Sequence, residues 1–140
     1  MGGGKPFNKE KDKMNNEHII FVKEAELPYS DIVVTEGKYM FISGLVSEDL
    51  STREEIYGTM QFETKTLLDN LKTILEANGS DMDHVVKADV IVRSWADRAE
   101  MNEEYVKHFR ADKLPARILF GDVSLSGKSK VEMSFVATKK

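Results

Sequence analysis

The sequence predicts a single α+β domain in which two helices cover one face of a mixed β-sheet. Its 140 residues, of which 41% are hydrophobic, suffice for one domain with an apolar core. Short β-branched and aromatic segments alternate with two stretches of helical period, which predicts the element order β-β-β-α-β-α-β-β. Cysteine is absent, so packing has to hold this fold together without disulfides or thiolate metal sites.

Three short strands are predicted at residues 19–22, 32–35 and 38–43, because these segments are rich in β-branched and aromatic residues. Gly37 lies between the last two segments, which predicts a hairpin turn there. The residues that follow, 46–58, are mostly polar and predict a surface loop.

A long helix is predicted over residues 59–78. It ends at Gly79, because glycine adopts the left-handed conformation of a helix end at little cost. Apolar residues at spacings of three and four form one stripe that we expect to be buried: Met60, Leu67, Leu71, Ile74 and Leu75. Charged residues are expected away from the centre of this stripe: Glu63, Lys65, Asp69, Lys72 and Glu76.

The second half of the chain predicts a strand over residues 83–93, a helix over 96–109, and strands over 117–125 and 131–138. One face of the first of these strands is expected to carry Val86, Ala88, Val90 and Val92. The helix is expected to bury Met101, Tyr105 and Phe109. Because two helices can cover only one face of the sheet, we expect the other face to pack against further subunits.

Residues 1–16 are polar and predict a disordered tail ahead of a domain at residues 17–140. This tail has neither the apolar segment of a secretion signal nor the arginines of a mitochondrial leader, which favours the cytoplasm. No apolar run approaches the ~18 residues that a membrane span needs, so no membrane partner is expected.

The charge balance argues against a nucleic-acid partner. The formal net charge is −4, whereas proteins that bind phosphate backbones usually carry a positive excess. His18, His84 and His108 lie far apart without metal-ligand spacing, so no metal site is expected.

Two charged residues stand within strand patterns: Arg117, after Leu114-Pro115-Ala116, and Glu132, between Val131 and Met133. A charge in a buried strand is unfavourable unless it is paired or functional, although both residues could also lie on an exposed face or in structural ion pairs. In a plain hairpin closed by residues 126–129, Arg117 would lie about six residues, or ~20 Å, from the position opposite Glu132. The two side chains could then meet only through another strand order or another subunit.

Three other residues are candidates for a binding site. Ser43 and Gly44 end a strand, where glycine could let a ligand approach the backbone or could mark a bulge. Tyr29 follows Pro28 in a turn, where it could contact a ligand or pack against the domain.

From Leu27 to Ala137 the chain resembles the YjgF-like reactive intermediate deaminase family, also catalogued as liver perchloric-acid-soluble proteins. No single matching segment is specific to the family, but the order and spacing of the segments together are specific to it. The pieces are Pro28-Tyr29-Ser30, Phe41-Ile42-Ser43-Gly44, Leu68-Asp69-Asn70-Leu71-Lys72 with Glu76-Ala77-Asn78-Gly79, Val85-Val86-Lys87, Met101-Asn102-Glu103-Glu104-Tyr105, Pro115-Ala116-Arg117 and Val131-Glu132.

The resemblance implies a chorismate-mutase-like homotrimer whose sites lie in clefts between subunits. It implies that Arg117 grips the carboxylate of a small enamine or imine substrate, a task that suits a planar two-pronged donor. Glu132 then orients or activates water, and Tyr29, Ser43 and Gly44 line the pocket. The implied reaction converts an enamine such as 2-aminoacrylate, through its imine, to a 2-oxo acid and ammonia without a cofactor.

The chain departs from the family pattern at several positions near these residues. Many members carry Gly-Pro-Tyr-Ser-Gln and Ser-Gly-Gln, where this chain has Leu27-Pro28-Tyr29-Ser30-Asp31 and Ser43-Gly44-Leu45. Leu119 replaces a common cysteine, and Ser134 replaces a second glutamate. The carboxylate anchor and the water-positioning acid remain, while the rest of the pocket differs.

The sequence leaves two other functions open. Some members of the family are labelled endoribonucleases or translation inhibitors, although the acidic charge of this chain opposes RNA binding. A non-catalytic binder of small carboxylates would also retain Arg117.

Overall fold

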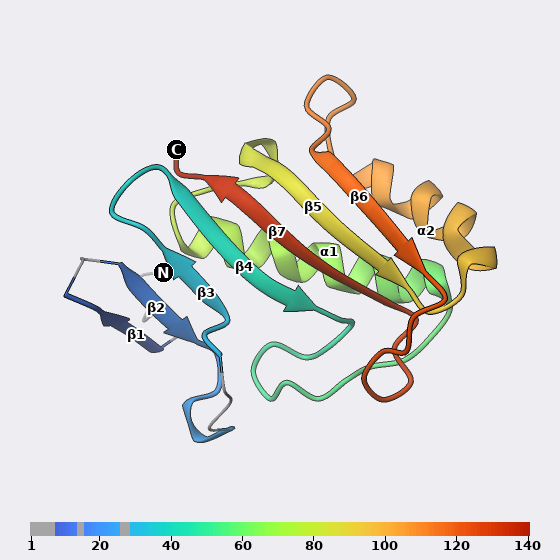
Figure 1. The fold of residues 1–140 in the computed structure, drawn as a ribbon, viewed down its shortest axis with the longest axis horizontal. Coiled ribbons are helices and arrows are strands. Elements are labelled where there is room, and N and C mark those ends of the chain that lie inside the picture. Colours follow the sequence, from blue (N-terminus) through green and yellow to red (C-terminus); the bar gives the residue numbers. More distant parts are fainter. Residues whose placement is uncertain (1–7, 14–15, 26–28) are drawn as a thin grey trace.

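The computed structural model describes residues 8–13, 16–25 and 29–140. Its centre is a mixed seven-stranded sheet with the strand order β1-β2-β3-β4-β7-β5-β6. Figure 1 shows both α-helices behind this sheet, on the same face. The predicted α+β class, with two helices covering one face of a mixed sheet, is therefore confirmed.

The strands are β1 (Asn8–Lys11), β2 (Glu17–Ile20), β3 (Ile32–Val34), β4 (Tyr39–Leu45), β5 (Val85–Val92), β6 (Ala116–Gly121) and β7 (Val131–Thr138). The α-helices are α1 (Met60–Ala77) and α2 (Arg98–Tyr105). Short 3-10 segments occupy Lys23–Ala25, Met82–His84, Trp95–Asp97 and Val106–His108. After β1, the elements follow the predicted order β-β-β-α-β-α-β-β.

β1 differs from the expectation of a disordered tail over residues 1–16. Residues Asn8–Lys11 pair antiparallel with β2, from Asn8 opposite Ile20 to Lys11 opposite Glu17. Backbone hydrogen bonds along the open edge of β2 supply this pairing, so β1 forms without apolar side chains of its own. Residues 1–7 and 14–15 lie outside the described residues.

The long helix α1 begins and ends close to the predicted positions. Thr59 caps its first turn, with its hydroxyl accepting a hydrogen bond from the Phe62 N–H at 3.0 Å. The predicted apolar stripe is buried, as are Met101, Tyr105 and Phe109 in and after α2. The expectation for Glu63 is wrong, because its side chain is fully buried.

Glu63 can be buried because its carboxylate has three partners. It accepts hydrogen bonds from the backbone N–H of Lys130 at 2.8 Å and of Gly58 at 3.1 Å. The Lys130 ammonium lies 3.6 Å away. This carboxylate therefore ties α1 to the residues just before β7, and a buried charge with such partners is tolerated.

The expectation for Val86 is also wrong. β5 shifts register against β7 between Val85 and Lys87, which places Val85 in the core and leaves Val86 42% exposed. Beyond this bulge, Ala88, Val90 and Val92 are buried as predicted.

The loop at residues 46–58 is not wholly a surface loop. Glu48 and Asp31 are both buried, and Arg53 forms ion pairs with each of them. Arg53 also adopts a left-handed backbone conformation, with φ of 65°. We infer that these ion pairs hold the loop against the sheet despite the local strain.

The last two strands do not form a hairpin. β7 lies between β4 and β5 and is antiparallel to both, whereas β6 is an edge strand parallel to β5. β6 also ends at Gly121, four residues before the predicted end of this strand. Among the described residues, no helix combines the length and the apolar character that crossing a bilayer requires.

Candidate functional site

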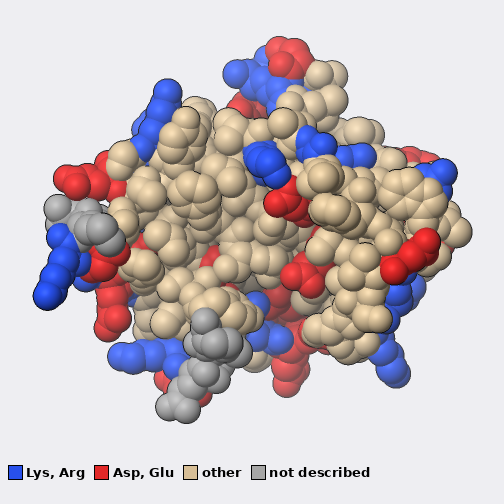
Figure 2. Space-filling model, viewed as in Figure 1, with Lys and Arg blue, Asp and Glu red and all other residues tan. Residues whose placement is uncertain are grey.

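The face of the sheet away from the helices is uncovered and largely apolar. In β7, Val131, Met133, Phe135 and Ala137 are buried towards the helices, while the alternate residues face the other way. Large apolar side chains on this second face are about half exposed: Tyr39, Phe41, Ile118 and Phe120. Figure 2 shows that residues other than Lys, Arg, Asp and Glu occupy much of this face, with a few charged side chains among them.

Glu132 projects from β7 on this uncovered face and packs against Gly44 of β4. A Cβ atom added to Gly44 would lie 2.1 Å from Glu132 Oε2, so only glycine leaves room for this carboxylate. Within the described part of the chain, Glu132 has neither a hydrogen bond nor an ion pair. Burial raises its pKa, and the negative charge of Glu55 raises it further.

Gly44 lies in a bulge of β4. Ile42 is opposite Phe135, and Leu45 is opposite Met133. Ser43 and Gly44 of β4 therefore both face Ser134 of β7, which is the pattern of a bulge. The Ser43 hydroxyl donates to the Ser30 carbonyl oxygen at 2.8 Å. Of the predicted pair, Gly44 lies against Glu132, and Ser43 precedes it in the bulge.

Tyr29 is 46% exposed and lies near the buried ion pairs of the loop. Burial disfavours the charged form of Arg53 and so lowers its pKa. The hydrogen bond to Glu48 and the charges of Glu48, Asp31 and Tyr29 outweigh burial, and together they raise the pKa of Arg53. Leu27 and Pro28, which precede Tyr29 in the matched motif, lie outside the described residues.

Arg117 lies on the other face of the sheet. It is opposite Ala88 of β5, and Ala88 is opposite Phe135 in the core, so the Arg117 side chain leaves β6 towards the helices. The guanidinium lies 4.8 Å from the centre of the Tyr105 ring in α2, and the residue is exposed. Burial raises the pKa of Tyr105 to about 12, although the charge of Arg117 opposes this shift.

One chain therefore does not bring Arg117 and Glu132 together. Glu132 aligns through Ile91 with Phe120, which is three residues, or ~10 Å, along β6 from Arg117. Since the two side chains also leave opposite faces, the observed strand order does not unite them, and a shared site requires a second subunit.

Glu55, whose charge acts on Glu132, and its two hydroxyl partners were not predicted from the sequence. Glu55 accepts hydrogen bonds from the Tyr57 hydroxyl at 2.5 Å and from the Ser126 hydroxyl at 2.7 Å. These residues lie in two irregular segments, and no periodic pattern relates positions 55 and 126. Gly127, after Ser126, leaves room for this contact, because a Cβ there would lie 2.3 Å from the Tyr57 hydroxyl and 2.4 Å from Glu55 Oε1.

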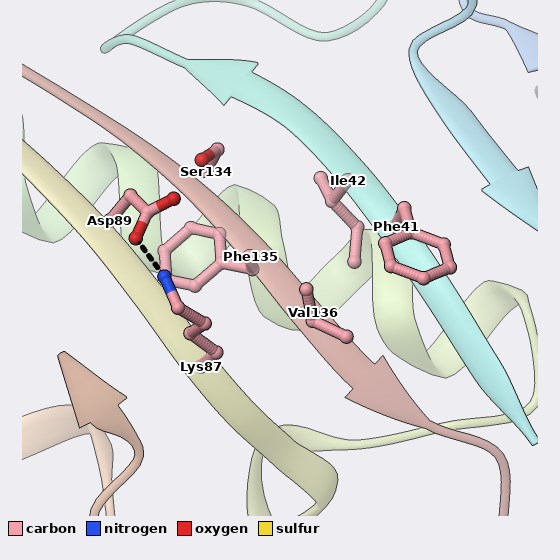
Figure 3. Close-up of a pocket in the computed structure, with 7 residues that line it drawn as sticks. All are labelled: Phe41, Ile42, Lys87, Asp89, Ser134, Phe135 and Val136. Atoms are coloured by element: carbon pink, nitrogen blue, oxygen red, sulfur yellow. Dashed lines mark hydrogen bonds and ion pairs between the residues drawn. The ribbon is translucent and has the colours of Figure 1, made fainter.

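A separate pocket of about 220 Å³ opens on the same face. Figure 3 shows Lys87 and Asp89 paired on one side of it, opposite Phe41, with Ser134 on β7. None of the predicted site residues lines this pocket. The described residues also include no cluster of three or more side chains that could hold a metal ion.

Comparisons with known proteins identify the family of the chain. The model of the family described as Endoribonuclease L-PSP matches residues 22–139. A mouse 2-iminobutanoate/2-iminopropanoate deaminase is 35% identical over 112 residues, which cover 80% of this chain and 82% of that protein. A RutC family protein of Pyrococcus horikoshii is 32% identical and covers 88% of this chain and 98% of its own length.

Solved structures with a similar fold point to the same family. A Thermotoga maritima protein described as an endoribonuclease is 37% identical, with a TM-score of 0.74 over 83% of this chain and 90% of that one. RidA of a Psychrobacter species is 28% identical, with a TM-score of 0.72 over 81% of this chain and 89% of that one. The chain belongs to the YjgF-like reactive intermediate deaminase family, the family of Endoribonuclease L-PSP.

Proposed function

We propose that this protein hydrolyses 2-imino acids and their enamine tautomers to 2-oxo acids and ammonia, in clefts between the subunits of a homotrimer. The main support for the proposal is the state of Glu132. Its half-buried carboxylate lies against Gly44 and has no partner among the described residues, and burial raises its pKa. A carboxylate that no protein group occupies is free to accept a proton from water and to pass it on, as hydrolysis of an imine requires. Relatives named 2-iminobutanoate/2-iminopropanoate deaminases support the reaction class.

In the proposed reaction, water adds to the imine carbon while Glu132 accepts a proton from it. Glu132 passes this proton to the nitrogen, and the adduct hydroxyl supplies the second proton as the C=O bond forms and the carbon–nitrogen bond breaks to release ammonia. Water and proton transfer suffice for these steps. Tyr29, Ser43 and Gly44 are proposed to line the pocket.

Arg117 is proposed to bind the substrate carboxylate from a neighbouring subunit. Its guanidinium is exposed on the edge strand β6, next to the Tyr105 ring, and no hydrogen bond or ion pair within the described residues occupies it. The uncovered apolar face of the sheet supports the assembly, because burial of half-exposed residues such as Phe41 and Phe120 favours association. Light scattering is expected to give the mass of a trimer, and a stable monomer at micromolar concentration would contradict an intersubunit site.

Ammonia release from freshly generated 2-aminoacrylate tests the reaction. Arg117→Ala and Arg117→Lys are expected to lose substrate binding and turnover together, since loss of a charge-assisted bidentate contact weakens affinity by about a hundredfold. Glu132→Gln is expected to keep most of the affinity for a 2-oxo acid while turnover falls by ~10²-fold or more. Arg110→Ala, which removes an exposed arginine, is the control. Wild-type turnover by Arg117→Ala would refute the assigned site.

RNA cleavage is the second candidate, because the family description and the Thermotoga protein carry the word endoribonuclease. The net charge of −4 opposes it. Salt-dependent RNA binding and cleavage by the purified protein, both lost in Glu132→Gln, would favour this candidate over deamination. Binding of small carboxylates without ammonia release would instead indicate a non-catalytic binder.

A further inference from the structure

Arg117 is held on one side by a tyrosine ring. Figure 1 shows helix α2 next to the edge strand β6, and the contact between Tyr105 and Arg117 joins these two elements. The Arg117 guanidinium lies 4.8 Å from the centre of the Tyr105 ring, a distance at which a cation is attracted to the face of an aromatic ring. Since no hydrogen bond or ion pair within the described residues holds the guanidinium, this ring is what restrains it.

The Tyr105 ring is itself fixed in the core. The residue is only 3% exposed, and its ring centre lies 4.9 Å from that of Phe109. Met101, one turn earlier in α2, is fully buried as well. A tyrosine side chain has only two rotatable bonds to its ring, so it loses little conformational freedom when it is packed in this way. The ring is therefore a rigid support for Arg117, which is exposed to solvent.

The Tyr105 hydroxyl group is covered and has no hydrogen-bond partner among the described residues. A ligand beside Arg117 can therefore not reach this oxygen without displacing the side chains that cover it. Burial disfavours the tyrosinate and raises the pKa of Tyr105 to about 12, while the charge of Arg117 opposes this shift. Tyr105 is thus neutral at physiological pH, and it acts on Arg117 through its ring.

The ring restricts Arg117 before any ligand arrives. An arginine on an exposed strand edge otherwise moves among many rotamers. A ligand that binds such a side chain has to stop this motion, and the entropy that is lost weakens the affinity. Beside the ring, the guanidinium is restrained in advance, and no hydrogen bond within the described residues occupies its N–H groups. These groups remain free to donate to a carboxylate.

We propose that Tyr105 is a positioning residue that holds the Arg117 guanidinium in place for the carboxylate of the substrate. This inference rests on the proposed function, in which Arg117 binds that carboxylate. Tyr105 acts through Arg117 and not on the reacting atoms. The contact between Arg117 and the carboxylate lasts through the reaction, so loss of Tyr105 weakens substrate binding and leaves the proton transfers at Glu132 intact.

Three variants separate the effect of the ring on Arg117 from its effect on core packing. Tyr105→Leu removes the ring beside the guanidinium, and Tyr105→Phe restores the ring without the hydroxyl. Phe109→Leu is the matched control, because it removes the neighbouring ring of the same cluster while Tyr105 stays beside Arg117. Circular dichroism and light scattering check folding and assembly. If Tyr105→Leu does not fold, Tyr105→Met replaces it, because the flexible methionine side chain fills more of the vacated space.

Affinity for pyruvate, the 2-oxo acid that 2-aminoacrylate gives, is the first readout. We expect Tyr105→Leu to weaken it by about threefold to tenfold, the typical effect of having to order one free side chain on binding. Tyr105→Phe is expected to recover most of this loss, and Phe109→Leu to bind like the wild type. In the Arg117→Ala background, Tyr105→Leu should add no further loss.

Two outcomes of this measurement would overturn the inference. Wild-type affinity in Tyr105→Leu would show that Arg117 needs no support from the ring. An equal loss in Phe109→Leu, or an undiminished loss in the Arg117→Ala background, would show that Tyr105 acts on the core and not through Arg117.

Kinetics with 2-aminoacrylate distinguish positioning from damage to the fold. A poorly positioned Arg117 raises KM and leaves kcat within about twofold of the wild type. A partly unfolded variant instead lowers kcat in proportion to the protein that is lost and keeps KM unchanged. The second pattern in Tyr105→Leu would contradict the positioning role.

NMR of the Arg117 side chain keeps the test independent of turnover. The current in an aromatic ring shields protons that lie above its face, so the Arg117 side-chain protons, assigned with Arg117→Ala, are expected to be shifted upfield. Tyr105→Leu should abolish this shift, and Tyr105→Phe should keep it. A wild type without the shift would overturn the inference. If the wild type releases no ammonia, the proposed deamination fails, and the pyruvate affinities still decide whether Tyr105 positions Arg117.

Discussion

Arg117 and Glu132 lie on opposite faces of the same sheet. Arg117 aligns through Ala88 with the buried Phe135, while Glu132 aligns through Ile91 with the half-exposed Phe120. A single ligand can contact both side chains only if they come from two different subunits. In the proposed site, the two side chains therefore come from neighbouring subunits.

This relationship predicts complementation between two defective variants. Subunits of Arg117→Ala and Glu132→Gln, mixed in equal amounts, unfolded and refolded together, are expected to regain roughly a quarter of the wild-type activity, since one cleft in four then contains both native residues. Each variant refolded alone is the control. Mixed assemblies that form, as seen by mass spectrometry, but stay inactive would place both residues of one site in the same chain.

Gly44→Ala is predicted to damage turnover more than stability. The new Cβ would lie 2.1 Å from Glu132 Oε2, so the carboxylate has to swing away from its present position. We expect kcat to fall by about a hundredfold, while the melting temperature changes by only a few degrees. Gly37→Ala is the matched control, because its Cβ would meet only Thr35 Oγ1, at 3.8 Å. Wild-type kcat in Gly44→Ala would show that the present position of Glu132 is not needed.

Arg53→Ala is predicted to be strongly destabilising at neutral pH. It leaves the buried Asp31 and Glu48 without their shared cation, which typically costs about 3–5 kcal/mol. Arg110→Ala removes exposed pairs and is expected to cost less than about 1 kcal/mol. Urea denaturation of both variants measures the difference.

The same variant is predicted to recover stability as pH falls. Burial raises the pKa of Glu48 above its ordinary value, although Arg53 opposes this shift. The folded protein therefore binds this proton more tightly than the unfolded chain, and the stability that the group contributes is lost as pH rises through its folded pKa. Without Arg53 that pKa rises further, so the deficit of Arg53→Ala should be smaller at about pH 5 than at neutral pH. A deficit independent of pH would contradict this account.

Deletion of residues 1–16 is predicted to leave the domain at residues 17–140 folded. The described residues of this segment are exposed or partly exposed, so little apolar area is lost with them. Circular dichroism should show native secondary structure, and thermal melting should show a fall of only a few degrees. A large fall would show that β1 contributes strongly to the stability of the domain.

The sequence was sufficient to predict the fold because the core follows simple periods. The apolar stripe of α1 and the alternation in β7 are read directly from residue spacing, and the structure buries these residues as expected. Prediction failed where a local irregularity or a distant partner decides burial. Val86 is exposed because of a bulge, and Glu63 is buried because Lys130, far along the chain, supplies its partner.

The candidate site was predicted in part for the same reasons. Glu132 and Arg117 stand out because charged residues interrupt strand patterns, and Gly44 stands out at a strand end. Glu55 and Ser126 could not be found in this way, because their contact joins two irregular segments that only the tertiary fold brings together.

β1 has a consequence for the behaviour of the protein at high concentration. Its four residues, Asn8 to Lys11, occupy the open edge of β2, which carries the apolar pair Ile19 and Ile20. Exposed sheet edges recruit strands from other molecules, and charged side chains on an edge discourage this. A protein trimmed of its first 16 residues would therefore fold and still aggregate more readily, because the backbone of β2 would be open to its own copies.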